Sequence, residues 1–140
     1  MSEEDDDIPP AVAGEGDEPE IISTYTRAEA LADGTLIDVT EQVTEAGVRI
    51  PTAVTRAVWN EYVKLTPTAE KKGENIEGRL WDVVWMFRCA AVRSTAQGEI
   101  RFQLYVTTER ATPTLVTLKA TCLPGDDGKP VFTIMLPDES

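Results

Sequence analysis

The residue types that most often carry chemistry are sparse in this 140-residue chain, which contains two cysteines and no histidine. Without imidazole, the chain cannot form a histidine-based catalytic triad or a histidine metal site. Cys89 and Cys122 lie far apart in the sequence and match neither a zinc-binding spacing nor a disulfide framework. We therefore expect both cysteines to be reduced and to pack as small hydrophobic residues.

Carboxylates and glycine loops give no stronger signal for catalysis or for a cofactor. Asp126 and Asp127, in the sequence GDDG, could bind calcium weakly, but the EF-hand pattern and its distal glutamate are absent. Paired carboxylates could act as a general acid and base, yet nothing in the sequence selects a pair. No glycine-rich phosphate loop or dinucleotide-binding motif occurs either. We predict a protein that is not an enzyme and that holds neither a metal ion nor a cofactor.

The acidic residues are concentrated at the N-terminus. The net charge is −12, and nine of the 25 acidic residues fall within the first 20 positions, which contain no base. Prolines and small residues fill much of the rest, so this segment cannot bury enough apolar surface to offset the entropy of ordering it. We predict a disordered acidic tail at residues 1–22 and a single folded domain at residues 23–140.

The same charge distribution narrows the range of partners. An acidic tail favours solubility and disfavours direct binding to nucleic acid or to an anionic membrane. No apolar run approaches the roughly 20 residues needed to cross a bilayer, and the N-terminus lacks the basic and apolar regions of a signal peptide. Together with two reduced cysteines, these features predict a cytoplasmic protein that does not associate with membranes.

The first half of the folded part reads as short helices separated by turns. Capping-box spacings and glycine stops predict helices at residues 27–33 and 40–47, with a short extended segment between them. Pro51 favours the start of a third helix, over residues 51–65. Trp59 and Val63 project from that helix opposite its apolar face. These two side chains either pack against a second layer of the same fold or contact a partner.

The sequence GRLWDVVWMFRCAAV, residues 78–92, predicts the central helix of the fold. It is apolar around most of its circumference, which predicts burial on most sides and places Trp81 and Trp85 in the core. Arg88 falls on the apolar side, where a guanidinium group needs carboxylate or carbonyl partners. Arg88 could form one structural ion pair, reach solvent near the helix end, or bind an anion or a partner.

Beyond residue 98 the apolar period changes from 3.6 to 2, which predicts strands at residues 99–108, 114–123 and 130–136. The segment PGDDGKP joins the last two as a hairpin loop. The expected fold class is α+β: a three-stranded antiparallel meander packed on one face by about four helices. The other face would display Arg101, Tyr105 and Lys119 to solvent or to a partner.

Five blocks of sequence carry a resemblance to a known family: YTRAEALADGTLIDVTE, RIPTAVTRAVW, GRLWDVVWM, TLKA and PGDDGKPVFTIMLPDE, in that order. With them the chain resembles a family of short uncharacterised proteins encoded on bacterial plasmids, phages and integrated elements, described as a domain of unknown function. The resemblance covers residues 24–139 and supplies no catalytic residues. It implies a small protein that acts by binding a host protein, including proteins of restriction or CRISPR defence.

These observations predict a non-enzymatic protein-interaction module of a mobile genetic element, such as an antagonist of host defence. The partner would be a host protein, bound through Trp59, Val63, Arg101, Tyr105 and Lys119. A small ligand-binding protein or enzyme is one alternative, and it requires a concave pocket with convergent charged groups. A weak single-stranded nucleic-acid binder, using the exposed sheet face, is the other. The sequence leaves the identity of the partner and the oligomeric state open.

Overall fold

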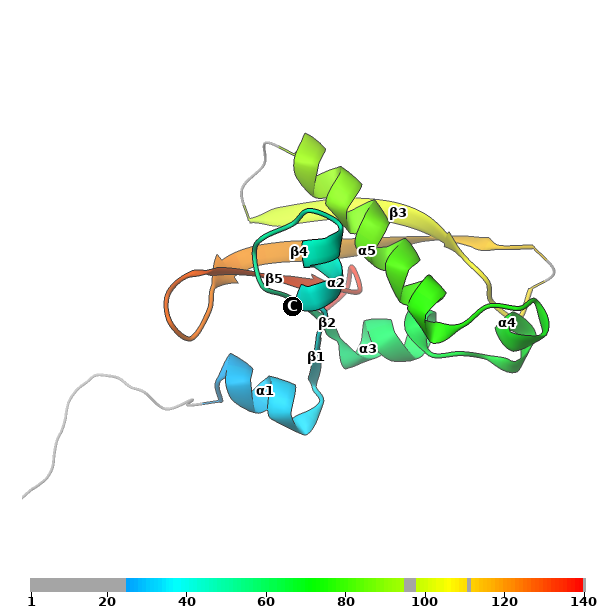
Figure 1. Ribbon diagram of the computed structural model, residues 1–140, viewed down its shortest axis with the longest axis horizontal. Helices are drawn as coiled ribbons and strands as arrows, with labels where there is room; N and C mark the ends of the chain where they lie inside the picture. The colour runs from blue at the N-terminus through cyan, green and yellow to red at the C-terminus, as the bar shows by residue number, and fades with distance from the viewer. Residues whose placement is uncertain (1–24, 95–97, 111, 140) are drawn as a thin grey trace, which may run out of the picture.

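The structure, a computed structural model, describes residues 25–94, 98–110 and 112–139. Within them the chain folds into a mixed sheet with helices packed on it, an α+β arrangement (Figure 1). The helices are α1 (Arg27–Asp33), α2 (Thr40–Glu45), α3 (Arg56–Val58), the π-helix η1 (Trp59–Val63), α4 (Pro67–Lys71) and α5 (Ile76–Arg93). The strands are β1 (Leu36–Asp38), β2 (Thr52–Thr55), β3 (Glu99–Val106), β4 (Thr114–Pro124) and β5 (Pro130–Met135). The predicted acidic tail at residues 1–22 lies outside the described residues.

The sheet has five strands in the order β1-β2-β5-β4-β3, so the predicted three-stranded antiparallel meander is wrong. β3, β4 and β5 are antiparallel neighbours, with Phe102 opposite Leu118 and Ala120 opposite Ile134. β2 pairs in parallel with β5, and β1 pairs antiparallel with β2. The three C-terminal strands are therefore one part of a larger mixed sheet, whose other two strands come from the N-terminal half of the chain.

Residues 51–65 do not form the single helix that their periodicity predicts. They begin with β2, because the β-branched side chains of Thr52, Val54 and Thr55 favour an extended backbone. Parallel pairing with β5 then buries Thr52 and Val54 completely. Helical structure begins only after the strand, where Thr55 Oγ1 accepts a hydrogen bond of 3.2 Å from the Val58 backbone N–H.

α5 is the longest helix of the described residues and packs on β3, α2 and η1 (Figure 1). Phe87 at its centre is fully buried. The Phe87 ring meets Phe132 edge-on, with 5.0 Å between ring centroids, and lies 6.0 Å from the ring of Phe102. Burying one such ring contributes about 1.5–3 kcal/mol, and each favourable aromatic pair adds about 0.5–1.5 kcal/mol. This three-ring cluster fixes α5 on the sheet.

The outer side of α5 faces solvent, so the prediction that this helix is buried on most sides is wrong. Trp81 and Trp85 are 38% and 41% exposed and stack on each other, with centroids 6.0 Å apart. The helix buries one side only, through Arg79, Leu80, Val83, Val84, Phe87 and Ala90. The reason is geometric: α5 packs on β3, α2 and η1, and these contacts leave the side that carries Trp81 and Trp85 exposed.

The loop acids Asp126 and Asp127 have different roles. The Asp126 carboxylate accepts hydrogen bonds of 3.0 Å from the backbone N–H groups of Arg27 and Ala28, at the start of α1. These two bonds lower the pKa of Asp126. Asp127 accepts a hydrogen bond from the Lys129 backbone N–H within the loop itself. The β4–β5 loop therefore ties α1 to the sheet, as a structural contact.

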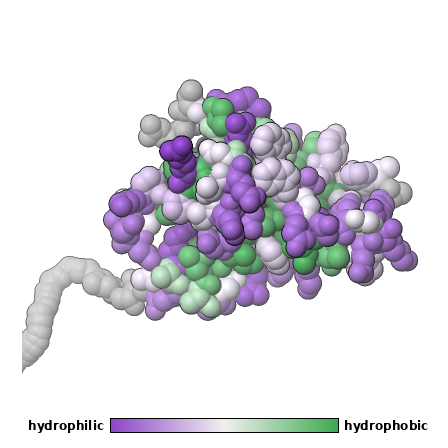
Figure 2. Space-filling model, in the orientation of Figure 1, coloured by the Kyte–Doolittle hydropathy of each residue, from purple (hydrophilic) through white to green (hydrophobic). Residues whose placement is uncertain are grey.

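The face of the molecule shown in Figure 1 is mixed in hydropathy. Hydrophobic side chains gather around α1 and α3 in this view, and hydrophilic ones cover much of the rest (Figure 2). Hydropathy alone therefore does not mark a docking site on this face of the molecule.

The three-ring cluster generates a stability prediction. We expect Phe87→Ala to lower the free energy of unfolding by about 3–5 kcal/mol, because it leaves a cavity between α5 and the sheet. Trp85→Ala, on the exposed side of the same helix, is the matched control and should lose less than about 1.5 kcal/mol. Urea denaturation of the two variants measures the difference, and equal losses would contradict this assignment of the core.

Candidate functional site

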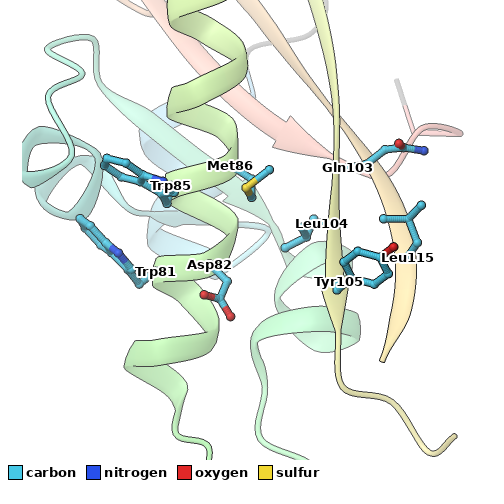
Figure 3. Close-up of a pocket in the computed structure, with 8 residues that line it drawn as sticks. All are labelled: Trp81, Asp82, Trp85, Met86, Gln103, Leu104, Tyr105 and Leu115. Atoms are coloured by element: carbon cyan, nitrogen blue, oxygen red, sulfur yellow. The ribbon is translucent and has the colours of Figure 1, made fainter. Parts of the chain in front are cut away.

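Three adjoining hollows follow the outer edge of β3. The central hollow, of about 660 Å³, is lined by Trp81, Asp82, Trp85 and Met86 of α5, Gln103, Leu104 and Tyr105 of β3, and Leu115 of β4 (Figure 3). An inner hollow of about 140 Å³ shares Asp82, Leu104 and Tyr105 with it and continues to Thr107. An outer hollow of about 480 Å³ shares Met86 and Gln103 with it and continues to Arg93 and Arg101. We call this continuous surface the β3-edge groove.

The backbone of β3 forms the floor of the groove, because β3 is the last strand of the sheet. The Cys122 backbone N–H donates to the Gly98 carbonyl, a hydrogen bond of 2.9 Å that fixes which residues of β3 bond to β4. Hydrogen-bonded pairs alternate along an antiparallel ladder, so the even-numbered residues of β3 bond to β4. The backbone N–H and C=O groups of Glu99, Arg101, Gln103 and Tyr105 therefore point outward, and no strand of the described residues pairs with them.

α5 forms one wall of the groove. Figure 3 shows Asp82 and Met86 pointing from the helix toward β3, with the indoles of Trp81 and Trp85 on the helix flank farther from the strand. Helical spacing aligns Asp82, Met86 and Arg93 along this side of α5, so they line successive hollows. The middle of the groove is consequently apolar, and its two ends are polar.

Arg88 holds the aromatic rim in place. Its guanidinium lies 5.1 Å from the centroid of the Trp85 ring, and its Nε donates a hydrogen bond of 3.2 Å to the Ala46 carbonyl in the turn after α2. A cation over an indole face is an attractive arrangement. Among the described residues Arg88 has no carboxylate partner. The predicted need for a polar partner is met by the Ala46 carbonyl, and the predicted ion pair is not seen among the described residues.

Arg79 closes the inner end of the groove. It is 4% exposed, and its Nη1 donates to Glu74 Oε1 at 2.9 Å and to the Thr107 carbonyl at 3.3 Å. Its Nε donates to the Val63 carbonyl at 3.3 Å, and the Thr107 hydroxyl donates to the other oxygen of Glu74. Arg79 Nη2 is buried and has no hydrogen-bond partner in the described part of the chain. The inner end thus combines a fixed ion pair with an unmet donor.

The two carboxyl groups at the inner end have opposite pKa shifts. For Glu74, desolvation raises the pKa, but hydrogen bonds from Thr107 and Arg79 outweigh it, so the pKa is lowered overall. For Asp82, desolvation and the nearby charge of Glu74 raise the pKa more than Arg79 lowers it. Glu74 is therefore committed to its ion pair, whereas Asp82 is a carboxylate without a cation bonded to it in the described residues.

The predicted partner-binding residues do not form one surface. Arg101, Tyr105 and Lys119 share the outer face of the sheet, with Arg101 opposite Lys119 in the β3–β4 register. Tyr105 is 67% exposed and borders the groove. Trp59 is half-buried against the core, and Val63 is fully buried. The Val63 side chain is therefore a core residue rather than a contact for another protein.

Sequence reasoning missed the α5 wall because it placed Trp81 and Trp85 in the core. A signal was present: at 100° per residue, the charged Glu77 falls on the same side of the helix as the two indoles. A charged residue beside the two indoles indicates a face directed to solvent.

The described residues contain no candidate metal site and no disulfide. No group of three or more histidine, cysteine, aspartate or glutamate side chains is placed to hold a metal ion in residues 25–94, 98–110 and 112–139. Cys89 and Cys122 are both free and partly buried. In the same part of the chain, no helix is long and apolar enough to cross a membrane.

Comparison with known proteins identifies the family but not an activity. Residues 16–140 match the model of the Family of unknown function (DUF6573), and the chain belongs to that family. No curated protein and no solved structure matches the chain.

The opposite pKa shifts generate a pH-dependent prediction. We expect Glu74→Gln to lower the free energy of unfolding at pH 7 by about 1–3 kcal/mol, because it weakens the partner of a buried guanidinium. Asp82→Asn should raise the free energy of unfolding at pH 7, because it removes a carboxylate whose ionisation the folded state opposes.

The pH dependence of each effect follows from the difference between the folded and unfolded pKa of the group. Because the pKa of Glu74 is lower in the folded state than in the unfolded state, its carboxylate stabilises the fold at pH values above the unfolded pKa. This stabilisation is lost as the pH falls through the folded pKa, so the Glu74→Gln deficit should vanish in acid. A raised pKa destabilises the fold above the folded pKa, so the Asp82→Asn gain should vanish below about pH 4, the usual range for a carboxylic acid. Denaturation curves across this range measure both effects. Shifts of the same sign would contradict the two environments.

Proposed function

We propose that this chain is a non-enzymatic protein-interaction module that binds an extended segment of another polypeptide along the free edge of β3. The single observation that carries the proposal is the coincidence of an open strand edge with a groove. The outward backbone groups of Glu99, Arg101, Gln103 and Tyr105 lie where the three hollows follow the strand. Adding a strand to such an edge is an established mode of peptide recognition.

The chemistry of the groove fits a bound strand. Backbone hydrogen bonds to the outward groups of β3 supply affinity that does not depend on sequence. Because side chains alternate along a strand, every second one would enter the space between β3 and α5, against Met86 and Leu104. The others would lie over the outer face, against Tyr105 and Leu115. Specificity then comes from these two apolar surfaces.

The wider part of the proposal concerns the partner. The resemblance to proteins encoded on plasmids, phages and integrated elements supports a host protein as the source of the strand, with the chain acting in the cytoplasm as an antagonist of host defence. In this role the module needs no catalytic group. It would act by binding a strand of the host protein and so preventing that strand from pairing with its usual partner. The acidity of the chain, with its net charge of −12, disfavours nucleic acid as the ligand.

A small apolar ligand is the second candidate, because the central hollow has a volume typical of small-molecule sites, about 300–1,000 Å³. The two candidates differ in what they require of β3. A small ligand would contact side chains such as Trp81 and Met86 and would need no backbone hydrogen bond at the strand edge. The outward N–H of Gln103 therefore discriminates between them.

The test uses two substitutions at Gln103, whose side chain is exposed and whose N–H faces outward. Peptides selected on the wild-type chain from a random display library are titrated against each variant, with the fluorescence of the groove tryptophans as the signal. We expect Gln103→Pro, which removes the N–H, to weaken binding about tenfold, the equivalent of about 1.4 kcal/mol. Gln103→Thr keeps the N–H and favours a strand, so it should bind within about twofold of wild type.

The alternatives give different results in the same assay. Equal binding by both variants would contradict strand addition and favour a side-chain ligand in the central hollow. Failure to select any peptide would contradict the proposal as a whole. Binding of a single-stranded oligonucleotide at low salt, lost at higher salt, would instead support the nucleic-acid alternative.

A further inference from the structure

We infer that the β3-edge groove pairs with the same groove of a second copy of this chain, so that two β3 strands join antiparallel into one continuous sheet. This inference rests on the proposed strand-accepting edge and names one occupant for it. A host segment would then compete with the second copy for the edge. Three features of the groove carry the inference: its charge, its register and the position of its centre.

The charges of the groove are complementary to themselves. At the inner end Glu74 is paired with Arg79, so Asp82 is the charge without a partner among the described residues. At the outer end Arg101 is paired with Glu99, so Arg93 is the charge without a partner among the described residues. A two-fold axis is the symmetry of most homodimers, and it brings each surface against its own opposite end. Two antiparallel grooves therefore place the acidic end of each copy against the basic end of the other.

The register of β3 allows the pairing without conflict. Antiparallel pairing centred on Phe102 sets Glu99 opposite Tyr105 of the second copy, and Arg101 opposite Gln103 of the second copy. All four outward-facing residues of β3 then exchange backbone hydrogen bonds. No two like charges stand directly opposite each other, which is the arrangement that would destabilise a strand pair.

The two-fold axis through the centre of β3 also passes close to the centre of the groove-facing side of α5. The point midway between Asp82 and Arg93 on the helix falls beside Phe87, and the Phe87 ring lies 6.0 Å from the ring of Phe102. The middle of α5, at Phe87, therefore lies beside the middle of β3, at Phe102. An axis that pairs β3 with its copy also sets Asp82 across from Arg93 of the second copy, at both ends of the interface. Met86 lies between them and supplies the apolar middle.

The inference is tested by charge reversal. Wild-type chain is examined by sedimentation velocity over a concentration series, with the Asp82→Lys and Arg93→Glu variants beside it. Both side chains are exposed, so the variants should fold normally. We expect wild type to form a dimer and each single variant to dissociate about tenfold more readily, because each sets like charges together at both ends. An equimolar mixture of the two variants should form dimers again, because every reversed contact is then matched by its complement.

Matched controls separate the interface from overall charge. Glu45→Lys and Arg49→Glu change the net charge by the same amounts at exposed positions on and after α2, and they should leave the dimer unchanged. Gln103→Pro, which leaves the net charge unchanged but removes an outward backbone N–H, should give a monomer. Urea denaturation of each variant confirms that the fold is retained.

Each outcome decides the matter. A wild-type chain that stays monomeric would overturn the inference, as would a dimer insensitive to both Asp82→Lys and Gln103→Pro. If the wild type is monomeric yet still binds selected peptides in a manner sensitive to Gln103→Pro, self-pairing fails and the proposed function stands. If neither self-association nor peptide binding occurs, both fail together.

Discussion

The position of α5 over β3 depends on one packing contact, the Phe87 ring held against Phe132 and Phe102. Because α5 has sheet on one side only, its other side is left to solvent, together with the stacked indoles of Trp81 and Trp85. Because the same contact holds α5 over the last strand of the sheet, the helix becomes a wall beside an unpaired edge. The groove, its apolar middle and its charged ends all follow from this placement.

An unpaired edge is a liability that proteins reduce with charged side chains, prolines, bulges or covering segments. β3 carries neither proline nor glycine within its eight residues, and the described part of the chain lays no segment against its outer side. The ion pair between Arg101 and Glu99, 2.8 Å long, lies near one end of the strand and leaves the middle open. An edge that is regular, long and lined by apolar side chains is the arrangement expected where strand pairing is used rather than prevented.

The sequence predicted what local patterns encode and failed where distant segments decide. The period-2 alternation around Phe102 and the capping box of Thr26 with Glu29 identify β3 and α1 correctly. β2 was missed because its β-branched residues were read as part of a helix, and parallel pairing with β5, far along the chain, completes the strand. Trp81 and Trp85 were misplaced because the apolar content of α5 does not say how many layers surround it. Tyr105 and Arg101 were identified as surface residues, but the groove beside them depends on how α5 packs against β3.

Hydrogen–deuterium exchange at the β3 amides tests most directly whether this edge receives a strand. In dilute monomer, the outward amides of Arg101, Gln103 and Tyr105 should exchange fast, while those of Phe102 and Leu104, bonded to β4, should exchange slowly. The expected result is that the outward amides become protected as the protein concentration rises, or when a selected peptide is added. Outward amides that exchange fast at every concentration and with every peptide, or that are already slow in the dilute monomer, would contradict the account.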